Sequence, residues 1–224
     1  MPTTKSQTLE TRIALASALL SAATEAMIRR PDLPFLISTH LVLLHQITRA
    51  SVPLMEAAHR EANRMREDRV SRALIPYLER HIEEERNHDE WTLDDLASVG
   101  IERAQTLAAR PSASVAALVG AQYYWILHYH PVALLGYMAV LESNAPSDIL
   151  IERLQAKSGL PDSVFRTHRI HAALDPEHQA VLYGLVDRLP LDSAHESLIA
   201  DSALHTAAKL ADCLADTLAV SSTE

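Results

Sequence analysis

The sequence contains few residues that make cross-links or tight turns. Cys213 is the only cysteine among 224 residues, which excludes an internal disulfide and is typical of proteins in a reducing cytoplasm. Only 5 glycines stand against 48% hydrophobic residues, a composition that favours helices packed together with little turn chemistry. At this length the chain fits one domain with a substantial core. We therefore expect a single all-α domain covering residues 1–224.

Positive charge and long apolar runs are also scarce. The formal net charge is −9, and no basic stripe follows any segment, which argues against nucleic acid as a partner. The apolar stretch 35–44 is interrupted by three polar residues, so we expect no run that reaches the length of a bilayer span. Residues 1–9 are polar and lack the layout of a signal peptide. These features predict a soluble, cytoplasmic protein with no membrane partner.

Hydrophobic residues recur with a helical period along nearly the whole chain. Pro31 is expected to end the first helix, Asp68 to cap a later one, and Gly100 to follow another. No internal repeat or long linker divides the chain. The expected helices cover about residues 6–30, 34–49, 53–65, 69–98, 112–142, 148–157, 162–174, 176–187 and 192–218, with a short helix before Pro111.

The most informative motif is His171, Asp175 and His178, spaced i, i+4 and i+7. A helix would bring the three side chains onto one face. Imidazole and carboxylate together suit iron, manganese or zinc. Asp175 precedes Pro176, which either kinks the helix or opens a new one. We therefore expect a weaker second metal position here and a segment that becomes ordered when metal binds.

An upstream helix carries a second group of ligand-type residues. Glu85 and His88 form the Glu-x-x-His pattern that di-iron carboxylate proteins project into a bundle core. His81 is a further candidate ligand, and Glu84 competes with Glu85 for the same role. The alternative reading is a solvated charged face. Two histidines that bracket the carboxylates at a spacing of two helical turns favour the metal site.

Glu142 is a lone carboxylate near the end of a long apolar segment. On a continuous helix, Tyr124 and His128 lie on the same stripe as Glu142. A carboxylate on such a stripe is costly to bury unless something positive neutralises it, and a metal would do so. The alternative is a residue at a frayed helix end that reaches water. Tyr124 and His128 are candidates for lining a substrate pocket, or are satisfied core residues.

The ordered combination of these motifs resembles the haem-oxygenase-like di-iron oxidases and oxygenases. The resemblance covers roughly residues 76–188 and rests on the block His81–Trp91 with Asp94–Leu96, on Glu142 and on the C-terminal motif. It implies a haem-oxygenase-like fold of about seven core helices. Some members of the family have a carboxylate ligand seven residues before the first histidine ligand. This chain has His81 at that position, so either His81 or a glutamate at a shifted position would take the place of the missing carboxylate. The residues that would hold two irons are Glu85 or Glu84, His88, Glu142, His171, Asp175 and His178.

The chemistry that the resemblance implies is reductive activation of dioxygen by two ferrous ions (Fe2+). Members of the family act on amines, amino acids or fatty acids, by N-oxygenation, oxidative C–C cleavage, desaturation or nitrile formation. The stripe with Tyr124 and His128 favours a small amine or amino-acid-type substrate, which with the resemblance suggests specialised metabolism (natural product biosynthesis), and a fatty-acid-directed oxidase is the alternative. Since no nucleotide-binding glycine motif is present, we expect an external electron donor.

Other classes of protein fit the sequence less well. A ferritin-type bundle would offer two Glu-x-x-His pairs, and only one is visible. A haem protein of the same fold would need an axial histidine, for which His40 and His45 are available, but their spacing is simpler to read as core histidines. Thiaminase-like relatives use a nucleophilic cysteine, whereas Cys213 lies far in sequence from the acidic cluster. A non-catalytic helical metal-binding or interaction module is the remaining alternative, and the last helix offers a surface for a homodimer.

Overall fold

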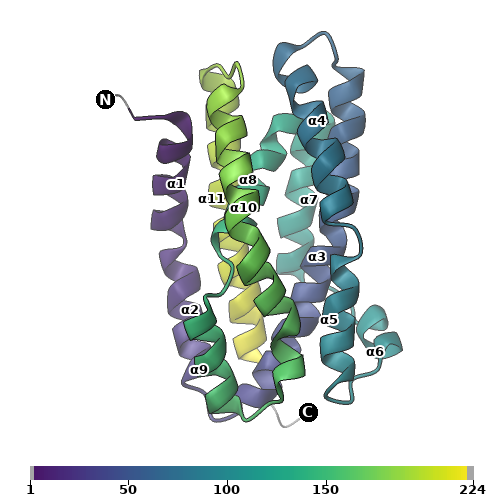
Figure 1. The fold of residues 1–224 in the computed structure, drawn as a ribbon, viewed down its shortest axis with the longest axis vertical. Helices are drawn as coiled ribbons and strands as arrows, with labels where there is room; N and C mark the ends of the chain where they lie inside the picture. The colour runs from purple at the N-terminus through teal and green to yellow at the C-terminus, as the bar shows by residue number, and fades with distance from the viewer. Residues whose placement is uncertain (1–2, 221–224) are drawn as a thin grey trace.

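The computed structural model describes residues 3–220, and within this range all regular structure is helical (Figure 1). The long helices stand side by side in a bundle, with α1 and α2 at one edge and α4 and α5 at the opposite edge. The α-helices are α1 Lys5–Ala16, α2 Ala18–Ile28, α3 Leu33–Arg64, α4 Arg69–Glu84, α5 His88–Ala97, α6 Arg103–Ala108, α7 Ala113–His128, α8 Leu134–Ser143, α9 Asp148–Ser158, α10 Arg166–Arg188 and α11 Ser193–Ala219. Two short 3-10 helices are η1 Pro131–Ala133 and η2 Asp162–Phe165. The expectation of an all-α fold is confirmed.

Side chains at the helix starts explain where the main helices begin. Asp68 accepts a hydrogen bond from the backbone N–H of Ser71 at 2.6 Å and so caps α4, as the sequence predicts. Ser112 caps α7 in the same way. Thr4 and Asp192 open α1 and α11 with reciprocal capping boxes. These caps satisfy backbone donors that have no partner inside the helix.

The core is made of two neighbouring groups of buried side chains. The larger group lies between α1, α3, α4, α7, α8, α10 and α11, and the smaller between α2, α3, α5, α9, η2 and α11. The tightest approach is at Gly136 of α8, where an added Cβ would lie 2.2 Å from the carbonyl oxygen of Ile199 in α11. Glycine at this point lets two backbones meet directly. The approach fixes α8, the helix that carries Glu142, against α11.

Two helices continue through prolines that were expected to separate them. α3 runs from Leu33 to Arg64 with Pro53 inside it, and α10 from Arg166 to Arg188 with Pro176 inside it. Proline removes one helical hydrogen bond, but buried side chains flank it in both helices, apolar on both sides of Pro53 and apolar after Pro176. Tertiary packing therefore outweighs the local cost.

Two segments that were expected to be continuous are broken instead. The predicted helix 69–98 divides after Glu84, because Asn87 takes a left-handed conformation with φ 67°. The predicted helix 112–142 divides at Tyr129 and His130, where the backbone leaves the helical region. The break at Asn87 has no proline or glycine to signal it, whereas the second break is followed directly by Pro131, a usual signal of a helix end. Both breaks lie beside candidate site residues.

The expectation that no apolar run reaches membrane length is wrong for one segment. Lys5–Ile28 is long and apolar enough to cross a bilayer by length and composition alone. In the structure this segment is interrupted at Ser17, which separates α1 from α2. Leu9, Ile13 and Met27 from it are buried in the core. It therefore forms one edge of the bundle.

Candidate metal centre

Four helices bring the seven predicted metal ligands together. α4 and its C-terminal end supply the first pair, α5 begins with the third residue, α8 supplies the fourth, and α10 supplies the last three. The seven residues are His81, Glu85, His88, Glu142, His171, Asp175 and His178. Each contacts another member of the group within 3.5 Å. The convergence predicted from sequence is therefore present in the fold.

Glu85 lies at the centre of the group. Its two carboxylate oxygens are 3.0 Å from Nδ1 of His88 and 3.5 Å from Nδ1 of His178. The break after Glu84 makes this possible, because Glu85 ends α4 while His88 starts α5. The indole of Trp91 stacks on the His88 ring with centroids 3.9 Å apart. The Glu-x-x-His pair thus faces one point without sharing a continuous helix.

Glu142 and His81 form the second contact. His81 Nε2 is 3.2 Å from Oε1 of Glu142, and the other ring nitrogen of His81 is 3.3 Å from Oε2 of Glu84. Tyr77 stacks on the His81 ring, and His178 meets the ring edge-on at 4.9 Å between centroids. Both side chains of the pair are nearly inaccessible, at 2% and 5% exposure. Glu142 is a buried carboxylate rather than one at a frayed helix end.

α10 completes the group with its three residues on one face, as their spacing predicts. His171 Nδ1 lies 3.3 Å from Oδ1 of Asp175. The His171 ring also meets the His88 ring edge-on, with centroids 5.3 Å apart. His178, one turn further, reaches Glu85. The helix therefore contributes to both sides of the cluster.

Several donor atoms in this cluster are buried without a hydrogen bond from any residue in the described range 3–220. Those atoms are His81 Nε2, His88 Nδ1, His178 Nδ1 and both oxygens of Glu142. Their close contacts have ion-pair distances without hydrogen-bond geometry, so the hydrogen-bonding capacity of these atoms is not used within the described residues. Buried polar atoms are rarely left unsatisfied. Imidazole nitrogens and carboxylate oxygens arranged in this way fit a pair of divalent iron ions.

Burial and neighbouring charge shift the pKa values in opposite directions. Burial raises the pKa of the Glu142 carboxyl, and His81 offsets only part of the effect. Burial also opposes charge on Glu85, but the contact with His88 outweighs it and lowers the pKa of Glu85. The pKa of His81 is raised because Glu142 and Glu85 outweigh the cost of burial. Opposed shifts within one buried cluster are typical of functional sites.

Tyr124 and His128 do not lie at this site, and the prediction that they line a substrate pocket is wrong. The side chain of Tyr124 is 66% exposed, and His128 is also exposed. They belong to α7, whereas Glu142 belongs to α8. A continuous helix would have placed Tyr124 and His128 on the same face as Glu142. The break at Tyr129 and His130 removes this alignment.

A cavity of about 580 Å³ opens beside the cluster instead. Glu85, Glu142, His171 and Asp175 form part of its wall. The remaining wall is mainly apolar, from α2, α3, α9 and α11. Its volume is within the usual range for small-molecule sites. Sequence reasoning found the metal-type residues in the wall but not the cavity itself.

Two further histidines in the cavity wall were not predicted as site residues. His40 of α3 and His168 of α10 both line it. His40 was interpreted as a core histidine. His168 precedes His171 by three residues, a spacing that places both on the same helical face. That spacing was a usable signal in the sequence.

Cys213 is buried in α11, in agreement with its interpretation as a core residue. Burial raises the pKa of the Cys213 thiol to about 12. The thiolate that a nucleophilic mechanism requires is therefore scarce at neutral pH. Cys213 is also absent from the wall of the cavity. These features argue against a thiaminase-like use of this cysteine.

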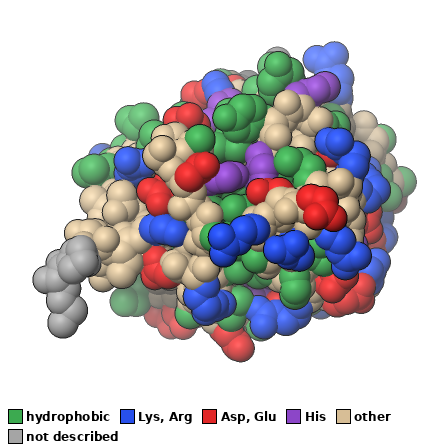
Figure 2. All heavy atoms as spheres, turned by 90° about the horizontal axis from the view of Figure 1, so that it is seen from above, with side chains coloured by type: hydrophobic (Ala, Val, Ile, Leu, Met, Phe, Trp, Pro, Cys, Tyr) green, Lys and Arg blue, Asp and Glu red, His purple; other side chains and the backbone are tan. Residues whose placement is uncertain are grey.

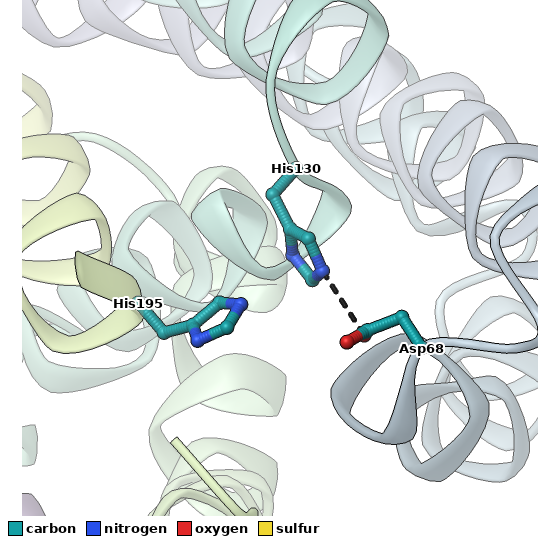
Figure 3. Close-up of side chains that lie close together, drawn as sticks. All are labelled: Asp68, His130 and His195. Carbon is teal, nitrogen blue, oxygen red and sulfur yellow. Dashed lines mark hydrogen bonds and ion pairs between the residues drawn. The ribbon is translucent and has the colours of Figure 1, made fainter. Parts of the chain in front are cut away.

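A second cluster of ligand-type residues lies at the upper end of the bundle, where α4, η1 and α11 begin (Figure 1). Viewed from above, this end carries histidines among acidic and basic side chains (Figure 2). Figure 3 shows His130 between Asp68 and His195. His130 Nδ1 accepts the backbone N–H of Val132, so a neutral ring donates from Nε2 to Asp68, 3.2 Å away. The ring is therefore occupied in capping η1, and we assign this cluster to the structure of the helix starts.

A family model described as iron-containing redox enzyme matches residues 43–211. The chain belongs to the iron-containing redox enzyme family. All seven candidate ligands lie within the matched residues. The resemblance to haem-oxygenase-like iron enzymes, stated from the motifs, is thereby confirmed at the level of the family.

Two solved structures share the fold of this iron-containing redox enzyme. A domain of unknown function with a heme oxygenase-like fold from Shewanella denitrificans OS217 has a TM-score of 0.82 at 16% identity, covering 94% of this chain and 90% of that one. A TenA homolog from Pseudomonas syringae pv. tomato str. DC3000 has a TM-score of 0.69 at 12% identity, covering 96% and 92%. Among curated proteins there is no significant match. The haem-oxygenase-like fold is confirmed.

Proposed function

We propose that this iron-containing redox enzyme is a non-haem di-iron oxidase or oxygenase that uses O2 to oxidise a small organic substrate. The observation that supports the proposal is the set of buried, unpartnered nitrogen and oxygen atoms contributed by four helices. A single metal would not engage seven ligand-type side chains. A pair of ions would use them all.

Two iron ions would be held by the seven clustered residues, with Glu85 between the two sides. When bound, ferrous iron supplies the electrons with which O2 is activated. The donors are His81, Glu85, His88, Glu142, His171, Asp175 and His178.

The protein's own residues orient and protect this centre. Glu84 contacts the second nitrogen of His81 and so fixes its tautomer. Trp91 covers one face of the His88 ring. The apolar cavity excludes water from the side on which a substrate would approach. No residue beyond the ligands is needed as an acid or base in this proposal.

The cavity bears on the class of substrate. Sequence reasoning favoured an amine or amino acid because Tyr124 and His128 were expected to line the pocket, and that basis is lost. The wall contains no lysine or arginine that would pair with a free carboxylate. A mainly hydrocarbon molecule therefore fits better than an amino acid. A separate electron donor and a cytoplasmic location remain predictions.

The test is anaerobic titration of metal-free protein with ferrous iron, followed by exposure to O2. We expect about two irons per chain, fast O2 consumption and a transient visible absorbance band. His178→Ala should bind fewer irons, whereas the same change at His205, which contacts the backbone of Ala117 and the ring of Trp125 outside the cluster, should have no effect. Uptake without O2 consumption would support a non-catalytic metal-binding module. A haem Soret band, or no uptake, would overturn the proposal.

A further inference from the structure

His40 and His168 face each other in the cavity wall beside the candidate metal centre. Their ring centroids are 6.0 Å apart, with the ring planes inclined by 31°. His168 is 9% exposed. Neither ring forms a hydrogen bond with any residue from 3 to 220, and the Nδ1 atom of each is buried without a partner. Two histidines are thus left without partners side by side in a wall that is mainly apolar and also contains serine and threonine side chains.

Both imidazoles are neutral at physiological pH. Burial lowers the pKa of His40 to about 4 and the pKa of His168 to about 3. A neutral imidazole has one N–H donor and one acceptor nitrogen. Leaving such groups without partners in a buried site costs free energy, and a ligand that supplies the partners recovers it. The pair can therefore both donate to and accept from a bound molecule.

The surroundings of the pair disfavour a charged ligand group. Among residues 3–220, no lysine or arginine lines the cavity. Outside the candidate metal ligands, its one acidic residue is Glu25, which Arg153 neutralises through two hydrogen bonds of 2.6 and 3.0 Å. A carboxylate beside the two histidines would have no counter-ion, and an ammonium would find carboxylates only among the candidate metal ligands about one helical turn away; burial of an unpaired charge is costly.

We propose that His40 and His168 form the polar subsite of the substrate cavity and bind an uncharged alcohol or carbonyl group of a mainly hydrocarbon substrate. That the bound molecule is a substrate rests on the proposed function, whereas its binding at the two histidines does not. His168 and His171 are three residues apart on α10, a rise of about 4.5 Å. The subsite therefore holds the substrate about one helical turn from the metal centre. The two histidines are positioning residues and take no part in bond making.

The test is isothermal titration calorimetry of the full-length, metal-free protein with three probes of equal chain length. The probes are 1-octanol, octanoate and octylammonium at pH 7. We expect 1-octanol to bind at least ten-fold more tightly than either ion. Tighter binding of octanoate or octylammonium, or no binding of 1-octanol, would overturn the proposal.

Variants show whether the two histidines are responsible. His40→Leu and His168→Leu should each weaken 1-octanol binding about five- to ten-fold, the effect of one lost hydrogen bond. His168→Gln, which keeps a neutral donor and acceptor, should restore part of the affinity. His205→Leu, outside the cavity, is the matched control. Unchanged affinity for 1-octanol in both leucine variants would refute the subsite. If His168→Leu does not fold, unchanged affinity in His40→Leu alone would refute it.

A second measurement reads the histidines directly. In protein labelled with ¹⁵N-histidine, 1-octanol should shift the ring nitrogen signals of His40 and His168 and leave that of His205 in place. Absence of any shift at saturation would contradict the proposal. Since no iron is present, failure here leaves the di-iron proposal standing, and failure of iron uptake leaves this subsite standing.

Discussion

Glu84 and Glu85 are adjacent in sequence and differ in what they contact. The side chain of Glu85 is 10% exposed and lies against His88 and His178. Glu84 is 38% exposed and lies 3.3 Å from Nδ1 of His81 and 4.0 Å from Nε2 of His178, so the two glutamates share His178 and differ in their second contact. A carboxylate on the second nitrogen of a ligating histidine orients the ring and strengthens the ligand. The sequence left the two as competitors for one role, and their surroundings suggest two different roles.

Glu85→Gln is expected to reduce iron content from about two ions to one or none per chain, because the central carboxylate lies between two histidines. Glu84→Gln should keep two ions but bind them about 10- to 100-fold more weakly. Metal analysis after dialysis gives the content, and titration against a chromophoric chelator gives the affinity.

Glu83→Gln is the matched control for this pair. Glu83 is 70% exposed and pairs with Arg86 on the surface, so its replacement should leave iron binding unchanged. If Glu84→Gln loses iron and Glu85→Gln does not, the two assignments are exchanged. The three glutamates are consecutive and receive the same substitution, so any difference in iron binding among the variants results from the position of the side chain.

Residue-scale predictions succeeded where the signal was local. The spacing of His171, Asp175 and His178 needs only one helix to bring the side chains together, and α10 provides it. Tyr124 and His128 depended on a helix that continues past Tyr129, and it does not. Residue spacing therefore predicts a shared helical face well over about two turns of helix, and less well over about five turns, because the helix can end in between.

At the scale of single elements, α10 contains a weak point beside two of its candidate ligands. Pro176 has no N–H, so the carbonyl of Ala172 receives no helical hydrogen bond from it. Asp175 and His178 flank this position. Metal-free protein should exchange the amides of residues 171–185 at least ten-fold faster than iron-loaded protein, as read by hydrogen exchange. Equal protection with and without iron would disprove coupling between this segment and the metal.

The contact of α8 with α11 makes a second prediction at this scale. In Gly136→Ala the new Cβ would overlap the Ile199 carbonyl and lie 2.7 Å from the backbone nitrogen of Ala203. Since both obstacles are backbone, we expect a loss of about 3 kcal/mol in unfolding free energy, measured by urea denaturation. Displacement of α8 should also weaken iron binding through Glu142.

Gly120→Ala is the control for this change. Gly120 lies within α7, and nothing is within 4 Å of an added Cβ there. Alanine should stabilise the helix by about 1 kcal/mol. A tolerated Gly136→Ala would mean that α8 and α11 are further apart than the structure shows.

Helix existence could be predicted from sequence more readily than helix ends. Periodic apolar residues and caps such as Asp68 identify the helices correctly. The end at Asn87 carries no glycine or proline, the end of α7 is followed by Pro131, and the prolines at 53 and 176 lie inside helices. Pro131 was therefore a usable local signal, whereas at Asn87, Pro53 and Pro176 the outcome depends on packing against other elements, which the local sequence does not contain.

At the scale of the whole molecule, the site is a product of tertiary structure. The ligand-type residues could be chosen from sequence because metals need particular donor atoms. The cavity could not be predicted from sequence, because its wall combines α2, α3, α9 and α11 with the helices that carry the candidate ligands, and only the packed fold brings these helices together. His40 lies 128 residues before His168, and only the packed bundle places their rings 6.0 Å apart.

These two buried histidines also set how the metal-free protein responds to acid. The folded-state pKa values of His40 and His168 are lowered by burial to about 4 and about 3, whereas the unfolded chain titrates near 6.5. Above pH 6.5 both states are neutral and pH has no effect through these groups. Between pH 6.5 and 4 the unfolded state binds protons that the folded state does not. Stability therefore falls as the pH falls through this window.

At pH 5 each of the two histidines should cost about 2 kcal/mol of unfolding free energy relative to pH 7. Replacing either histidine by leucine removes the contribution of that histidine. The unfolding free energy of His40→Leu or of His168→Leu should therefore fall by about 2 kcal/mol less than that of the parent between pH 7 and pH 5. Urea denaturation at pH 7 and pH 5, with chelator present, measures the difference. His205→Leu should retain the full acid loss of the parent. Identical acid losses in the parent and the two cavity variants would mean that both rings are already charged or solvated in the fold, because only a neutral, desolvated imidazole produces this dependence.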